Sequence, residues 1–476
     1  MLSHVTINPE PVEKFRPVIG DEATDKLIEI GRAVAASLAG RTVWNVNSTA
    51  AGGGVAEMLQ TLLSYVLGAG IDTHWLVTSG DPEFFQITKR IHNGIHGSIG
   101  DGGPLGQEEH AHYQKICSQN AQDLIDKTKP GDIVILHDPQ TAGMVEAVQT
   151  AGRIVIWRCH IGLDQRNDVA NRTWDFIRPY LKDAQAYVFS RKLYAPDWLD
   201  ERRLEIISPS IDPFSPKNNS MDAETARSIL TYTGIIASDG SQSTPTYVRT
   251  DGTLKRIKRK ADILRTGPPP SATTPIVAQV SRWDKLKDMK GVLEGFANFV
   301  DSPDKVHLAL VGPVVGGVSD DPEQVSVFEE TAAAWRELPY SARSRIQLVC
   351  LPMDDIEENA AIVNALQRHA KVVIQKSLEE GFGLTVSEAM WKSTPMVGSA
   401  VGGIQDQIEH GVNGLLVQDP DNLEEFGVAV SSLLKDQSQA EIMGKEAKES
   451  VRKDFLASRH LQEYGTLLIT LVNRIG

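Results

Sequence analysis

The sequence lacks the features that mark several large classes of protein. Its 476 residues include only three cysteines, Cys117, Cys159 and Cys350, which lie far apart and in no CxxC pair. This usage argues against a disulfide framework or a zinc knuckle and is typical of a reducing, cytoplasmic compartment. No apolar run approaches the roughly 20 residues of a membrane helix, and no basic start precedes an apolar block. We therefore expect neither a membrane span nor a signal peptide.

Positive charge is also scarce. The chain has 62 acidic and 48 basic residues, which gives a net charge of −14. Such a surface repels polyphosphates, so nucleic acid is not an expected partner, whereas a phosphorylated small molecule needs only a local basic pocket. We interpret the one basic run, Leu254–Lys260, as a solvated linker rather than a binding patch.

Short apolar runs alternate with helical patterns in both halves of the chain, which predicts parallel sheets with helices on both faces. The length also exceeds that of one compact core. We predict an α/β fold with two doubly wound Rossmann-like domains, 1–212 and 275–457. The polar stretch 213–274 would be a linker or insertion, and the final helix, 458–476, would pack back on the first domain. The predicted strands are 42–47, 74–79, 132–138, 153–160, 186–190, 204–210, 275–283, 306–312, 345–351, 371–377, 395–400 and 414–419.

Ligands of such sheets bind beyond the carboxyl ends of the strands, and two facing domains form a cleft. After the first strand, Gly52, Gly53 and Gly54 lead into a helix, which suits close approach of an anion or a simple flexible turn. The spacing is not GxGxxG, and no acidic residue closes the second strand. This disfavours a nicotinamide-dependent oxidoreductase.

Histidines end two predicted strands of the same half. His137-Asp138 follows one strand and His160 follows the next. A neutral histidine can donate or accept a hydrogen bond, which suits a sugar hydroxyl. A lone histidine is more often structural, but two at neighbouring strand ends favour a functional site.

The second half carries two further motifs at strand ends. In SRWDKLKDMKG, Arg282 and Lys287 suit a diphosphate, although surface cations are common. In EEGFGLTVSEAMW, Thr385 and Glu388 have the spacing of a capping box, whereas Glu380 has no such role and we expect it to point into the cleft. The amides after Gly383 could bind a phosphate. No pattern predicts a metal site, and GxSxG and P-loop motifs are absent.

Together these pieces resemble the family 4 glycosyltransferases of the GT-B fold. The resemblance rests on SRWDKLK, on the E-x7-E spacing in EEGFGLTVSEAM and on VGSAVGGIQDQIEHGVNGLLV. In the first half, VWNVNSTAAGGGVAEML, FFQITKRIHNGIHG, LHDPQTAGM and WRCHIGLD are similar to trehalose synthases of the glycosyltransferring type. That family joins glucose from a nucleoside diphosphate glucose to free glucose, forming α,α-trehalose, and can run in reverse.

The resemblance implies a role for each matched position. Arg282 and Lys287 would stabilise the departing diphosphate in place of a metal ion, so no cofactor is expected. Two positions depart from the pattern. Asp288 stands where many relatives have glycine, and the stretch from Asp212 to Thr274 is longer and more polar than expected. The other implied contacts are donor glucose at Glu380, ribose at Glu388, sugar and phosphate at Gly383 and Leu384, diphosphate at Gly53 and Gly54, transferred sugar at His160 and acceptor hydroxyl at Asp138.

An α-linked donor giving an α,α product implies retention of configuration. No matched position offers a convincing carboxylate nucleophile for double displacement, so front-face transfer is the working hypothesis. Three alternatives stay open: a retaining trehalose phosphorylase on the same fold, another family 4 glycosyltransferase, and a sugar or nucleotide binding protein that has lost activity. The donor base, the preferred direction and the oligomeric state, a homodimer included, stay open as well.

Overall fold

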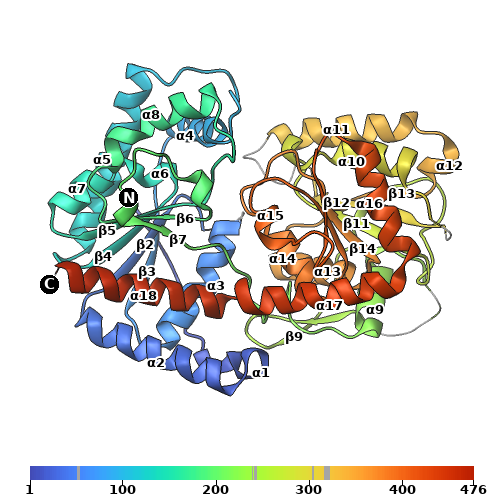
Figure 1. Cartoon of the computed structure of the whole chain (residues 1–476), viewed down its shortest axis with the longest axis horizontal. Coiled ribbons are helices and arrows are strands. Elements are labelled where there is room, and N and C mark those ends of the chain that lie inside the picture. Colours follow the sequence, from blue (N-terminus) through green and yellow to red (C-terminus); the bar gives the residue numbers. More distant parts are fainter. Residues whose placement is uncertain (51–53, 239, 241–243, 303–304, 316–321, 476) are drawn as a thin grey trace. The chain divides into compact units, whose positions relative to one another are not determined.

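Figure 1 shows the computed structural model of the chain, which describes residues 1–50, 54–238, 240, 244–302, 305–315 and 322–475. The chain divides into two compact units. The first comprises Met1–Ser210 and Phe455–Gly476, and the second comprises Ile211–Asp454. The chain therefore leaves the first unit once and returns to it for its last residues.

The first unit is built on a seven-stranded sheet in the order β1-β3-β2-β4-β5-β6-β7. Strand β1 pairs antiparallel with β3, and the other neighbours pair in parallel. The strands are β1 (Ser3–Val5), β2 (Val43–Asn47), β3 (Thr73–Val77), β4 (Ile133–His137), β5 (Ile154–Cys159), β6 (Ala186–Phe189) and β7 (Leu204–Ile206). The helices are η1 (Val12–Phe15), α1 (Arg16–Ile19), α2 (Asp21–Leu38), α3 (Gly54–Gly68), α4 (Pro82–Ile95), α5 (Gln107–Lys127), α6 (Pro139–Ala142), α7 (Val145–Thr150), α8 (Asp168–Leu181), η2 (Lys192–Tyr194), η3 (Glu201–Arg203) and α18 (Ala457–Ile475).

The central strands of this sheet are apolar on both faces because helices cover both. Successive side chains of a strand point to opposite faces. Val134 and Leu136 of β4 therefore join one core cluster, while Ile133 and Ile135 join another. This explains why the strands read as continuous apolar runs rather than as alternating patterns.

The last helix belongs to the core of the first unit. Helix α18 lies beside α2 and supplies Leu467, Leu468 and Leu471 to the cluster that contains Ile133 and Ile135 (Figure 1). Its apolar residues recur at helical spacing along one face, which is the pattern of a helix that packs on a core.

The second unit repeats the architecture, with a seven-stranded sheet in the order β10-β13-β12-β11-β14-β15-β16. Strand β10 pairs antiparallel with β13, and the other neighbours pair in parallel. The strands are β10 (Asp262–Leu264), β11 (Ile276–Val280), β12 (His307–Pro313), β13 (Ile346–Leu351), β14 (Val372–Gln375), β15 (Met396–Ser399) and β16 (Leu415–Val417). The helices after β11 are η4 (Lys285–Lys287), α10 (Met289–Phe299), α11 (Pro322–Glu337), α12 (Tyr340–Arg343), α13 (Ile356–His369), α14 (Leu384–Trp391), α15 (Ile404–Gln407), α16 (Leu423–Lys435) and α17 (Gln437–Asp454).

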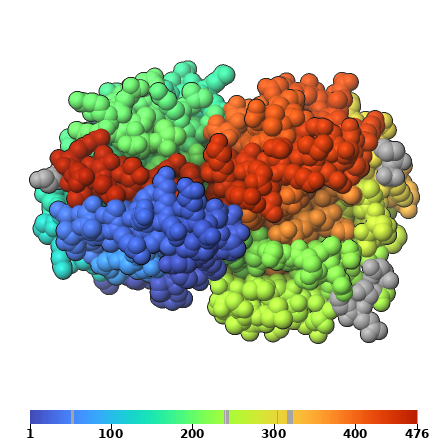
Figure 2. All heavy atoms as spheres, turned by 60° about the horizontal axis from the view of Figure 1, so that its bottom comes forward, coloured from blue at the N-terminus to red at the C-terminus, as the bar shows by residue number. Residues whose placement is uncertain are grey.

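The polar stretch 213–274 is folded as part of the second unit. Helix α9 (Ala223–Thr233) packs on α13, and β10 extends the sheet. Strands β8 (Thr246–Val248) and β9 (Leu254–Arg256) form a hairpin at the surface, in the yellow-green part of Figure 2. The basic run is anchored rather than free, because Glu358 of α13 accepts hydrogen bonds from the backbone amides of Lys258 and Arg259 at 2.9 and 2.8 Å.

Among the described residues, no helix is both long enough and apolar enough to cross a membrane.

We predict that Leu471→Ala lowers the free energy of unfolding by about 2–4 kcal/mol, because it leaves a cavity against the sheet of the first unit. Leu471 is 2% exposed in the core cluster. Urea denaturation of the full chain measures the change. The matched control is Thr466→Ala on the exposed side of α18, for which we expect a change within about 0.5 kcal/mol. Equal, small changes in both variants would show that α18 is not part of this core.

Candidate active site

The second unit gathers charged residues at the carboxyl ends of two neighbouring strands. Strands β11 and β14 pair in parallel, so their carboxyl ends meet at the same edge of the sheet. The loop after β11 carries Arg282 and Lys287, and the turn after β14 carries Glu380 and leads into α14. Residues that are far apart in sequence are therefore adjacent in space.

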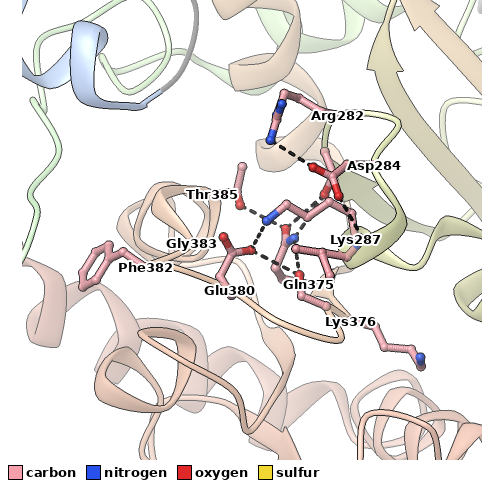
Figure 3. Close-up of polar contacts among 12 residues, drawn as sticks. Arg282, Asp284, Lys287, Gln375, Lys376, Glu380, Phe382, Gly383 and Thr385 are labelled. Carbon is pink, nitrogen blue, oxygen red and sulfur yellow. Dashed lines mark hydrogen bonds and ion pairs between the residues drawn. The ribbon is translucent and has the colours of Figure 1, made fainter. Parts of the chain in front are cut away.

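An ion pair joins these two loops. Lys287 Nζ lies 2.6 Å from Glu380 Oε2, and Ser377 Oγ donates to the same oxygen at 3.1 Å (Figure 3). The lysine side chain is 16% exposed and the glutamate side chain 10% exposed, so water screens the pair weakly. The sequence placed both residues at strand ends but did not predict that they pair.

Gly383 sets the geometry of the turn that precedes α14. Its φ is 80°, in the left-handed region, and a Cβ atom there would lie 3.2 Å from Glu380 Cγ. Glycine is the residue that adopts this conformation without strain. Gln407 fixes the turn from behind by donating to the carbonyl of Phe382 at 2.6 Å. Helix α14 thus starts at Leu384, beside Glu380. The amide of Val386 bonds to the carbonyl of Gly383 at 2.9 Å, and the amides of Gly383 and Leu384 lie before the first helical acceptor.

Arg282 lies at the more exposed side of the same loop. Its side chain is 51% exposed, and its guanidinium donates to Asp284 Oδ2 at 3.0 Å. Asp284 Oδ1 in turn accepts from the backbone amide of Leu286 at 2.9 Å, which holds the loop at the start of η4. Figure 3 shows Arg282 and Lys287 extending from this loop. The structure therefore brings both predicted cations to the end of β11.

Asp288 stands where many proteins of the resembled family have glycine, and the structure shows how an aspartate is accommodated there. Its φ of 45° is left-handed, a conformation that favours glycine but that aspartate tolerates. Its carboxylate caps α10 by accepting from the amide of Gly291 at 3.0 Å, and it pairs with Lys376. Lys376 is 1% exposed and was not predicted from the sequence. These two interactions compensate the strain and hold the loop of Lys287.

The capping-box interpretation of Glu388 is wrong. Helix α14 begins one residue before Thr385, with Gly383 as N-cap and no side-chain cap. Thr385 Oγ1 bonds instead to Gln375 Oε1 at 3.0 Å. Glu388 is buried, with Oε1 3.4 Å from Lys217 Nζ, and among the described residues its Oε2 has no hydrogen-bond partner. The positive φ of Gly383 moves the helix start and removes the geometry that a capping box needs.

The first unit brings the two predicted histidines together. Nδ1 of His137 lies 3.1 Å from Nε2 of His160, and the rings stack. Asp138 adopts a φ of 64°, and its Oδ1 accepts from the backbone amide of His160 at 2.8 Å. The other ring nitrogen of His137 lies 3.1 Å from Oδ1 of Asn45. Asn45 adds to a cluster that sequence reasoning had limited to three residues.

Burial sets the protonation of this cluster. It lowers the pKa of His137 to about 3 and that of His160 well below its ordinary value, with a further lowering by the nearby Arg158. Both imidazoles are therefore neutral near pH 7. Burial raises the pKa of Asp138 to about 6, against the hydrogen bond from the His160 amide and the charge of Arg158.

Sequence reasoning missed Arg158, a fully buried cation within an apolar strand. Its Nε and Nη1 have no hydrogen-bond partner among the described residues. Such a residue inside the run RIVIWRCH is a signal in itself, because an arginine is rarely buried without a reason.

The glycine loop is described only in part. Gly53 lies outside the described residues, and Gly54 is the first residue of α3. The contact of Gly53 and Gly54 with a diphosphate stays a prediction. Across the described residues, no group of three or more histidine, cysteine, aspartate and glutamate side chains is placed to hold a metal ion.

Comparison with known proteins identifies the class and then the family. Residues 355–450 match the family "Glycosyl transferases group 1", and residues 45–196 match "Trehalose synthase, N-terminal domain". A trehalose synthase of Thermococcus litoralis is 35% identical over 96% of this chain and 96% of its own length. One of Rubrobacter xylanophilus is 33% identical over 97% of each chain. The chain therefore belongs to the trehalose synthase family of GT-B glycosyltransferases.

More distant proteins share the fold or part of the sequence. The trehalose-6-phosphate synthase OtsA superposes with a TM-score of 0.67 at 13% identity over 90% of this chain and 99% of its own. Sucrose-phosphate synthase of Thermosynechococcus elongatus gives 0.64 at 17% identity, covering 91% of this chain and all of its own. A trehalose phosphorylase of Pleurotus sajor-caju is 23% identical over 86% of this chain and 54% of its own.

We predict that Asp138→Asn changes how stability depends on pH. Because the pKa of this carboxyl is raised to about 6, the folded chain binds the proton more tightly than the unfolded chain. Stability contributed by the protonated form is lost as pH rises from about 4 to about 6. The variant cannot lose this proton, so its free energy of unfolding should rise relative to that of wild type as pH increases from about 4 to about 6. The relative gain should be at most about 2–3 kcal/mol, because water screens the partly buried side chain.

Urea denaturation of both proteins at pH 4, 5, 6 and 7 measures this difference. Asparagine keeps an oxygen for the amide of His160. A difference between the two proteins that does not change with pH would contradict the raised pKa.

Proposed function

We propose that this protein transfers glucose from a nucleoside diphosphate glucose to free glucose, forming α,α-trehalose with retention of configuration, and that the reaction is reversible. The observation that carries the proposal is the Lys287–Glu380 pair at the start of α14. A cation, a carboxylate and helix amides lie together at the carboxyl ends of β11 and β14. These are the groups that a diphosphate and an attached sugar require.

The second unit supplies the donor site. Lys287, Arg282 and the backbone amides of Gly383 and Leu384, at the N-terminus of α14, bind the diphosphate, and the helix dipole adds to the favourable field. Glu380 accepts hydrogen bonds from the glucose hydroxyls. In the structure Lys287 lies on Glu380, so an arriving diphosphate competes for the ammonium. Glu388 binds the ribose hydroxyls, and its Oε2 has no hydrogen-bond partner among the described residues.

The first unit supplies the acceptor side. His160 contacts the transferred sugar as a neutral donor or acceptor, since burial lowers its pKa well below the ordinary value. Asp138 receives the acceptor hydroxyl, and the hydrogen bond from the His160 amide to its Oδ1 fixes the carboxylate. A contact of Gly53 and Gly54 with the diphosphate is also part of the proposal, although Gly53 lies outside the described residues.

The chemical step is front-face transfer. The bond between the anomeric carbon and the diphosphate oxygen breaks, while Lys287, Arg282 and the α14 amides stabilise the negative charge. The acceptor oxygen forms its bond on the same face, and its proton passes to the departing phosphate. These fixed charges supply the stabilisation that a metal ion gives in other transferases, so the proposal needs no cofactor.

A trehalose phosphorylase is the second candidate, supported by the 23% identical relative of that activity. It would use inorganic phosphate in place of the nucleoside diphosphate. Inorganic phosphate has no ribose for Glu388 to bind, so this buried carboxylate favours the synthase. Transfer to another acceptor and binding without turnover are further outcomes that a product assay detects.

We predict that the protein makes trehalose from glucose and one or more of the ADP, UDP and GDP derivatives of glucose. In reverse, trehalose with the same diphosphate should give a nucleotide sugar, and trehalose with phosphate should give no glucose 1-phosphate. Chromatography of the products measures both directions. Glucose 1-phosphate as the product would replace the synthase with the phosphorylase, and donor consumption without trehalose would exclude both.

We predict that Lys287→Ala lowers turnover by about 10²–10³-fold, because it removes one stabilising charge from the departing diphosphate. Lys285→Ala is the matched control, since Lys285 is an exposed lysine of the same loop. It should keep turnover within about twofold of wild type. Steady-state kinetics and circular dichroism on each variant make the test, and near-normal turnover in a folded Lys287→Ala variant would remove Lys287 from the site.

A further inference from the structure

Glu388 has a cationic partner that comes from a segment without an assigned role. Lys217 Nζ lies 3.4 Å from Glu388 Oε1, and the side chains are 20% and 3% exposed. Lys217 precedes α9 by a few residues, in the stretch that the sequence marks as a linker or insertion. A buried carboxylate is costly without a partner, so this pair is not an incidental surface contact.

The backbone around Lys217 is fixed to the helix that carries Glu388. The carbonyl of Asn218 accepts from Trp391 Nε1 at 3.2 Å, and its side-chain oxygen accepts from Lys392 Nζ at 2.9 Å. Lys392 also donates to the carbonyl of Glu388 at 2.8 Å. Lys217 therefore cannot move away from α14 without breaking several buried hydrogen bonds.

Helix α13 holds the same segment from its other side. Asn364 Nδ2 donates to the carbonyl of Pro216 at 3.0 Å, and Arg368 donates to the carbonyl of Asn219 at 2.8 Å. Asn364 is fully buried. Buried side chains of two helices thus anchor the residues on both sides of Lys217, which is the arrangement of a built site rather than of a flexible connection.

We propose that Lys217 is a positioning residue for nucleotide recognition: it holds the Glu388 carboxylate in the orientation that accepts the ribose hydroxyls of the donor. This inference rests on the proposed function. The 3.4 Å separation is longer than the about 2.7–2.9 Å of a charge-assisted hydrogen bond, which leaves Oε1 able to accept a hydroxyl proton. Oε2 has no partner among the described residues. Lys217 acts through Glu388 and does not touch the reacting atoms.

The proposal requires an effect that is confined to ligands with a ribose. In Lys217→Met, the KM for the nucleoside diphosphate glucose and the Kd of the free nucleoside diphosphate should rise about 10–100-fold, with kcat within about threefold of wild type. Inhibition by inorganic pyrophosphate, which has no ribose, should stay unchanged. The 2′,3′-dideoxy form of the diphosphate should bind wild type and variant equally.

Two variants serve as references. Lys217→Arg keeps the charge and should retain most of the affinity for the ribose diphosphate. Lys435→Met removes an exposed lysine of the same unit, which pairs with Asp301 at the surface, and should change nothing. If Lys217→Met does not fold, the double variant with Glu388→Gln removes both charges, and it should also lose its preference for ribose over dideoxyribose.

The outcomes separate this inference from the proposed function. Equal weakening of nucleoside diphosphate and pyrophosphate in Lys217→Met would show a general structural role and overturn the inference alone. Unchanged affinity for the ribose diphosphate would do the same. If calorimetry shows that wild type binds no nucleoside diphosphate at all, both the inference and the proposed function fall.

Discussion

The ion pair between Lys287 and Glu380 is the interaction on which the proposed donor site depends. It exists because β11 and β14 are parallel neighbours, so the segments that follow them meet at one edge of the sheet. Each of these poorly hydrated charges would be costly without the other, so the pair requires that both loops keep their conformation. The Asp288–Lys376 pair and the left-handed turn at Gly383 hold them. Backbone conformation and charge therefore act as one system.

The sequence predicted the two sheets well because each central strand is an apolar run buried on both faces. It missed β1 and β10, which pair antiparallel at sheet edges, and the hairpin of β8 and β9. Each of these strands spans three residues and lies in no apolar run, unlike β7 and β16, which are equally short but lie in such runs. Their position is determined by neighbours that lie far along the chain, and no local signal reports such pairing.

The residues of the candidate site also differ in whether the sequence could predict them. The strand pattern alone predicts that His160, at the end of β5, and Lys287, in the loop after β11, lie at the carboxyl ends of the sheets. Partners that meet through the fold, such as Lys217 with Glu388, do not. The capping box was wrong for a related reason, because Thr385 and Glu388 have the required spacing, but the φ of Gly383 starts the helix earlier. Local spacing cannot report the conformation of a preceding glycine.

The return of α18 to the first unit has a consequence for synthesis on the ribosome. The leucines that complete this core lie within the last residues of the chain, after the whole second unit. The second unit is contiguous in sequence, whereas the sheet of the first unit keeps an uncovered apolar face until α18 has been made. Until α18 packs, that face stays exposed, and it is what a chaperone would meet.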